Sequence, residues 1–112
     1  MMTVFEFFKN QYDEKVAEGY GTTKGCMINP EVPRGSFRWV QIAYRNFFGG
    51  ALQQRFEKCG ITLEQLKEAK ENGILKYWYD GRWIARQMGT QNHWSLTVKG
   101  LKELYKTYKG QW

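Results

Sequence analysis

Residues 62–88 read TLEQLKEAKENGILKYWYDGRWIARQM, and this stretch holds helix, turn and strand signals in close succession. Thr62 and Gln65 have the spacing of a capping box, in which each side chain bonds a backbone donor of the other residue. Apolar residues then recur at helical spacing as far as Asn72 and Gly73, which provide a left-handed helix stop. The pattern predicts a short helix that leads directly into extended chain.

The remainder of this stretch predicts a β-hairpin. Residues 74–79 are rich in branched and aromatic side chains, and Asp80-Gly81 is typical of a two-residue hairpin turn. Residues 82–88 are expected to return as the second strand. This arm then runs through a polar patch into residues 93–96, where we expect a bulge or a second turn.

Further helices are predicted on both sides of the hairpin. Thr97 can cap a helix over 98–108, whose apolar residues follow the i, i+3, i+4, i+7 rule. Ser36 precedes a helical segment over 37–48, and another covers 51–59. The predicted order is therefore helix, helix, helix, hairpin and helix.

The amino-terminal part adds one more helix and a loop. Thr3 and Glu6 form a second capping-box pattern, and an apolar stripe continues from there to Gly19. Residues 20–35 contain several glycines and both prolines, so we expect a connector without regular structure.

Leu66–Leu75, the hairpin, and the run Leu96-Thr97-Val98-Lys99-Gly100-Leu101 together resemble the winged-helix regulators of the MarR and PadR type. In that family a recognition helix ends in Gly-Leu-Ile or a similar run, a two-stranded wing follows, and Leu-Thr-x-x-Gly opens the next helix. The resemblance implies an α+β fold with one winged-helix domain over 36–112. Residues 1–19 would be an accessory helix and 20–35 a connector.

Composition limits the classes of protein to consider. A chain of 112 residues with 42% hydrophobic residues can bury one core, so we expect a single domain. Neither a signal peptide nor a membrane-length apolar run is present, which favours a cytoplasmic protein. Cys26 and Cys59 lack metal-ligand spacing, and we expect small buried groups there, with a disulfide between them as the alternative.

Catalytic motifs are not found, and no cofactor is expected. His93 is the one histidine, and there are no paired carboxylates, phosphate-binding glycine loop or nucleophile elbow. We interpret His93 as a partly buried polar ring and expect a protein that is not an enzyme.

Charge is distributed unevenly along the chain. Residues 1–31 carry three lysines and five acids, so with a total of +6 the residues 32–112 hold +8. A basic body favours a phosphate backbone as partner. Lysines on the last helix also fit an ordinary solvated face. The candidate nucleic-acid contacts are Arg38, Arg45, Arg55, Gln65, Lys67, Lys70, Lys76, Arg82 and Arg86.

The predicted recognition helix departs from the family pattern. Its exposed positions include Glu64, Glu68 and Glu71, which would repel phosphates and engage base edges poorly. Gln65 is the one residue of this helix that the resemblance suggests as a base contact.

Aromatic residues suggest a second kind of surface. Trp78 and Trp83 lie in the predicted hairpin, where one small core cannot cover both faces, although burial in an aromatic core is the alternative. Phe5, Phe8 and Tyr12 form the stripe of the first helix, which could pair between the subunits of a homodimer.

Two functions from different classes follow from these features. The first is a small nucleic-acid-binding module, a DNA-binding transcription regulator of a phage or another mobile element. The second is a phage-encoded inhibitor of the anti-CRISPR kind, which would bind a host nucleic-acid enzyme through its aromatic wing and its acidic helix.

Overall fold

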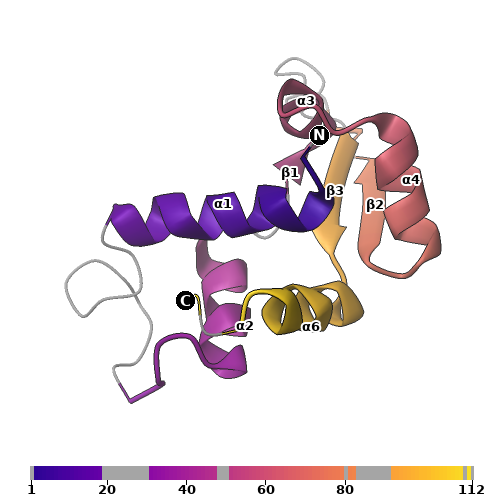
Figure 1. The fold of residues 1–112 in the computed structure, drawn as a ribbon. Coiled ribbons are helices and arrows are strands. Elements are labelled where there is room, and N and C mark those ends of the chain that lie inside the picture. Colours follow the sequence, from indigo (N-terminus) through magenta and orange to yellow (C-terminus); the bar gives the residue numbers. More distant parts are fainter. Residues whose placement is uncertain are drawn as a thin grey trace.

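The computed structural model describes residues 2–18, 31–47, 51–79, 81–82, 92–109 and 111. They form a mixed α+β fold in which helices surround a small antiparallel sheet (Figure 1). The elements are α1 (Val4–Ala17), α2 (Phe37–Phe47), β1 (Ala51–Leu52), α3 (Gln53–Lys58), α4 (Leu63–Glu71), β2 (Leu75–Tyr79), β3 (Asn92–Leu96) and α6 (Val98–Thr107). Most of the predicted connector, residues 20–30, lies outside the described residues.

Helices α1, α2, α4 and α6 begin at the hydroxyl residues that the sequence predicts. In α4, the backbone N of Gln65 donates to Thr62 Oγ1 at 3.2 Å, and the backbone N of Thr62 donates to Gln65 Oε1 at 2.9 Å. The same kind of bond starts α1, α2 and α6. The backbone N of Glu6 donates to the Thr3 hydroxyl, that of Trp39 to the Ser36 hydroxyl, and that of Gly100 to the Thr97 hydroxyl. A cap supplies the acceptor that the first helical turn lacks, so helix starts are local properties of the chain.

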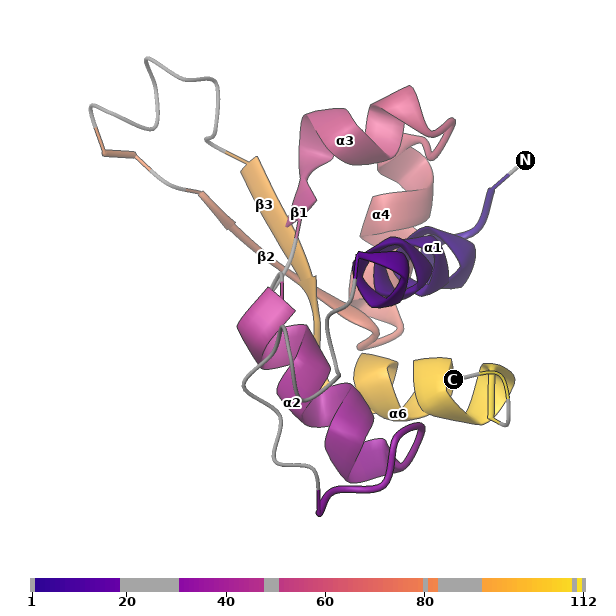
Figure 2. The same cartoon turned by 90° about the vertical axis from the view of Figure 1, so that its left-hand side faces the viewer.

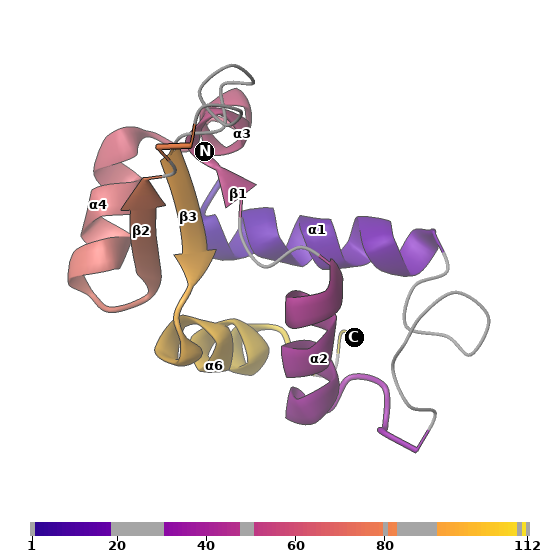
Figure 3. The same cartoon turned by 180° about the vertical axis from the view of Figure 1, so that it is seen from behind.

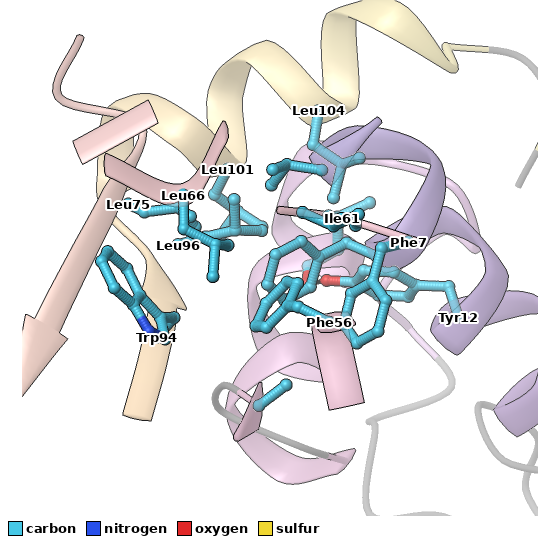
Figure 4. Close-up of a cluster of buried hydrophobic side chains, with 14 of the residues drawn as sticks. Phe7, Tyr12, Phe56, Ile61, Leu66, Leu75, Trp94, Leu96, Leu101 and Leu104 are labelled. Atoms are coloured by element: carbon cyan, nitrogen blue, oxygen red, sulfur yellow. Dashed lines mark hydrogen bonds between the residues drawn. The ribbon is translucent and has the colours of Figure 1, made fainter. Parts of the chain in front are cut away.

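Helix α1 is part of the common core. The ring of Phe7 stacks on Phe56 of α3 with a centroid distance of 4.2 Å. The hydroxyl of Tyr12 donates to the carbonyl of Val40 in α2 at 2.7 Å. Figure 4 shows Phe7, Phe56 and Tyr12 packed together beside the leucines of the sheet and of α6. Burying each such ring stabilises the fold by roughly 1.5–3 kcal/mol.

The helix predicted over 51–59 is wrong at its start. Ala51 and Leu52 form strand β1, which pairs with Trp94 and His93 of β3, and only Gln53–Lys58 is helical. Leu52 has helical spacing to Phe56, and this spacing predicts that the helix includes Leu52. Strand pairing with a segment far along the chain overrides that local pattern.

The described partner of β2 is the far end of the predicted second arm. Strand β2 pairs with Asn92–Leu96, with Leu75 opposite Leu96 and Tyr79 opposite Asn92. Residues 83–91, which cover most of the predicted return strand, lie outside the described residues. The two-residue turn signal was local, whereas the register is set by which face of the sheet is buried.

The three strands lie in the order β1-β3-β2, as Figure 3 shows from behind, with α2 and α6 below the sheet. Figure 2 shows α1, α3 and α4 on one side of the sheet. Because neighbouring residues of a strand point to opposite faces, Tyr77 and Trp94 face these helices. We call the opposite face, which bears Lys76, Trp78 and their neighbours His93 and Ser95 on β3, the outer face.

A close approach joins α6 to the turn between α4 and β2. Gly73 ends α4 with φ of 76°, a conformation that glycine adopts without strain. The hydroxyl of Thr97 donates to the carbonyl of Gly73, and the backbone N of Thr97 donates to the carbonyl of Ile74 at 2.9 Å. A Cβ at Gly100 would lie 2.1 Å from that same carbonyl oxygen. Position 100, in the first turn of α6, therefore has space for glycine only.

We predict that Gly100→Ala destabilises the fold by about 1–3 kcal/mol or more, because α6 must move away from the Ile74 carbonyl. Helix propensity alone would favour alanine by about 0.8–1.0 kcal/mol, so the steric and intrinsic effects have opposite signs. Urea unfolding followed by circular dichroism measures the change.

Gly60→Ala is the matched control. Gly60, unlike Gly100, has a positive φ, 84°, but a Cβ there meets no atom within 4 Å. We expect a loss of only about 1–2 kcal/mol from backbone strain. A smaller loss for Gly100→Ala than for Gly60→Ala would contradict the close approach.

Candidate functional site

The structure distributes the predicted basic residues over two faces of the sheet. Lys76 lies on the outer face, whereas Lys67 and Lys70 of α4 line a groove with Tyr77 on the opposite face. Lys76 on one face and Lys67 and Lys70 on the other therefore cannot contact one flat ligand together.

A groove of about 230 Å³ lies where α2, the sheet and the start of α6 meet. We call it the α2 groove, and its lining is Gln41, Tyr44, Arg45, Lys76, Leu96, Thr97, Val98 and Leu101. Arg45 and Lys76 both have exposed side chains here. None of these lining residues is acidic, so the two cations have no carboxylate beside them among the described residues of the groove.

Tyr44 fixes the geometry of the α2 groove. Its hydroxyl oxygen accepts a hydrogen bond from the backbone N of Leu96 at 2.7 Å, and it also bonds the side chain of Ser95. These bonds connect α2 to the last residues of β3. Burial raises the pKa of Tyr44 to about 12, so the hydroxyl stays neutral at physiological pH.

The α2 side of the groove continues along the helix. Arg38, Gln41 and Arg45 have i, i+3, i+7 spacing, and the two arginines are exposed. Residues 32–56 contain no aspartate or glutamate at all. Sequence reasoning singled out these arginines but missed Gln41 and Tyr44, and this acid-free run is the signal that would have drawn attention to the whole helix.

The outer face carries a stacked aromatic pair beyond the groove. The rings of Trp78 and His93 lie 3.9 Å apart between centroids and only 4° from parallel. Trp78 is 47% exposed, so about half of this residue remains accessible to a ligand although its ring is stacked on His93. Leu52 of β1 pairs with His93, which completes a row of three side chains across the sheet.

The side chain of Gln65, the predicted base contact, is engaged within the chain at the start of α4. Its amide oxygen accepts from the backbone N of Thr62 at 2.9 Å, and its amide nitrogen donates to the carbonyl of Met2 at 3.4 Å. The side chain is thereby engaged at the start of α4, against the segment before α1.

Helix α4 presents an acidic surface to solvent. Glu64, Glu68 and Glu71 are all exposed, while Leu66 is fully buried in the core. Lys67 and Lys70 turn toward Tyr77, with Lys70 Nζ at 5.8 Å from the centre of that ring. A phosphate backbone that approached the exposed face of α4 would meet carboxylates first.

The remaining predicted contacts lie apart from the α2 groove. Arg55 on α3 donates to Gln11 of α1 at 2.8 Å. Arg82 is exposed just beyond β2, and Arg86 lies outside the described residues, as does Trp83.

The predicted dimer stripe on the first helix is wrong at two of its three residues. Phe8 and Tyr12 are fully buried within the chain, because they pack on α2 and α3, so they offer no surface to a second subunit. Phe5 is only partly buried. Cys59 is a free, exposed thiol rather than the buried group expected from the sequence, and Cys26 lies outside the described residues.

Metal ligands and membrane-spanning helices would mark other kinds of site. No group of three or more His, Cys, Asp or Glu side chains among them could hold a metal ion. No helix in this part of the chain has the length and apolarity to cross a membrane.

Comparison with protein-family models, with curated proteins and with solved structures finds no match to this chain.

We predict that Tyr44→Phe makes the protein less stable at neutral pH but less sensitive to alkali. The substitution leaves the backbone N of Leu96 without its acceptor, at a cost of about 1–3 kcal/mol. Folding raises the pKa of Tyr44, so its contribution is complete below the ordinary value of 10.0 and is lost as the pH rises toward about 12. Unfolding midpoints in urea, measured across this pH range, test both effects.

The comparison between the two proteins isolates this hydroxyl, because lysine deprotonation affects both alike. An equally steep loss of stability above pH 10.0 in the native and Tyr44→Phe proteins would show that burial does not perturb this group.

Proposed function

We propose that this protein is a small non-enzymatic nucleic-acid-binding module of winged-helix architecture. The element order from α2 to β3, with sheet order β1-β3-β2 and α4 before the two longer strands, supports that architecture. The function rests on one observation: Arg45 and Lys76, from distant parts of the sequence, line the same groove, and none of the described residues that line it with them is acidic.

The distribution of charge orients such a module on its partner. Carboxylates are exposed on α1, at Glu6, Asp13 and Glu14, and on α4, whereas α2, β2 and β3 carry none among their described residues. A polyanion is therefore attracted to the side that holds Arg38, Arg45 and Lys76 and repelled from the side that holds α4. Guanidinium and ammonium groups there neutralise phosphates and release counterions, which makes binding depend on salt.

This arrangement favours contact with the backbone over reading of base edges by α4. In the proposal, α2 and β2 hold the phosphates, and Arg82 beyond β2 adds a contact next to them. A compact, basic protein of this kind fits a cytoplasmic DNA-binding transcription regulator of a phage or another mobile element. Its sequence preference would come from the hairpin region or from the shape of the DNA.

A second candidate is a protein-binding inhibitor of a host nucleic-acid enzyme, comparable to an anti-CRISPR protein. The exposed carboxylates of α4 and the exposed rings of Trp78 and Tyr79 favour it, because aromatic side chains are common anchors of protein interfaces. In that case, loss of the cations of the α2 groove would leave partner capture unchanged.

We predict that the double substitution Arg45→Ala with Lys76→Ala weakens binding of labelled duplex DNA and lowers its salt dependence. Two lost phosphate contacts reduce the slope of log K against log salt by about 2. Fluorescence anisotropy at several salt concentrations measures affinity and slope together.

Lys67→Ala with Lys70→Ala is the matched control, since it removes the same charge from the opposite face of the sheet. We expect a much smaller change in affinity and slope. Equal effects of the two pairs would contradict the α2 groove as the phosphate site. No binding of duplex or single strands by the native protein at low salt would reject the proposed function itself.

A further inference from the structure

The open indole of Trp78 is the feature that carries a more specific inference. Its other side lies flat on His93, with a centroid distance of 3.9 Å and an angle of 4° between the rings. The Nε2 atom of His93 is buried and has no hydrogen-bond partner among the described residues. The stack holds the indole in one orientation before any ligand arrives, which lowers the entropy that binding would cost.

The surroundings of this ring are cationic. Lys76 lies two residues before Trp78 on the same strand and on the same face, and it lines the α2 groove with Arg45. Ser95 and His93 are the paired residues of β3 on this face, and neither adds a negative charge. A ligand that joins a flat ring to an anionic group therefore matches the outer face along its length.

We propose that the outer face binds an unpaired nucleotide, whose base stacks on Trp78 while adjacent phosphates contact Lys76 and Arg45. The inference rests on the proposed function for the phosphate contacts and adds the base-stacking site. Bases inside a duplex have both faces covered by their neighbours, so only an unstacked base can extend the Trp78–His93 pair. The preferred ligand is then single-stranded nucleic acid or an unpaired segment next to a duplex.

The charge of this face argues against a protein surface as the occupant. An aromatic anchor at a protein interface has no need for two neighbouring cations in a groove without carboxylates, whereas a nucleotide chain supplies one phosphate for each base. Tyr79, on the same strand but on the opposite face, is more exposed than Trp78, at 57%, yet pairs with Asn92 and has no ring stacked beneath it among the described residues.

The test compares a short labelled oligothymidylate with a blunt duplex of the same length by fluorescence anisotropy. Trp78→Ala should weaken binding of the single strand about tenfold or more and leave duplex binding and the salt slope unchanged. Trp78→Phe keeps a flat ring and should restore most of the affinity. Tyr79→Ala is the matched control and should bind both ligands as the native protein does.

A second readout does not depend on the alanine variant being folded. Base stacking should quench part of the tryptophan emission of the native protein when oligothymidylate is added. That part should be absent in Trp78→Phe, whose circular dichroism spectrum reports whether the fold is kept.

The outcomes distinguish failure of base stacking on Trp78 from failure of the proposed nucleic-acid binding. If Trp78→Ala binds oligothymidylate as well as the native protein, if it loses single strand and duplex equally, or if Trp78→Phe keeps the full quenching of tryptophan emission, base stacking on Trp78 is overturned. The proposed function survives that result if the Arg45 and Lys76 pair still loses affinity. If neither nucleic acid binds at low salt, both proposals fall.

Discussion

The register between β2 and β3 is the constraint on which the candidate site depends. With Leu75 opposite Leu96, the strands send Leu75, Trp94 and Leu96 to the core and Lys76 and Trp78 to the outer face. A slip of one residue would exchange the two faces, burying a lysine and exposing leucines. The same apolar pattern that stabilises the core therefore places the cation and the open indole side by side.

Separation of charge is the second organising feature. Helices α1 and α4 carry exposed carboxylates, whereas α2 and the outer face present arginine and lysine. Helix α4 is the segment that the winged-helix resemblance would make a recognition helix. Its exposed side chains include glutamates, and the Gln65 side chain is engaged with Thr62 and Met2, so few of its groups could contact DNA bases. If the chain binds nucleic acid, its fold is used from a different side than the resemblance implies, with the sheet and α2 as the contact surface.

Helix starts were predictable because a cap is a contact within four residues. Thr3, Ser36, Thr62 and Thr97 all make the expected bonds, and Gly73 ends α4 as expected. The errors concern pairing between distant segments. The helix predicted over 51–59 includes Ala51 and Leu52, which form β1, and the described partner of β2 is Asn92–Leu96, ten or more residues beyond the predicted turn. Local turn and helix signals carry no information about which distant strand supplies the hydrogen bonds.

The sequence by itself determined the four helices that begin at a hydroxyl cap, the mixed α+β class and the basic character of residues 32–112, because these follow from local spacing and composition. It also made Arg38, Arg45, Lys76 and Trp78 candidate site residues. Only the tertiary structure decided which of these residues meet. In the tertiary structure, Arg45 and Lys76 line the same groove, whereas Lys67 and Lys70 lie on the other face of the sheet. Phe8 and Tyr12 are buried, and the ring of Trp78 stacks on His93. The physical reason is that these proximities depend on strand register and helix packing, which are set by burial of the whole core.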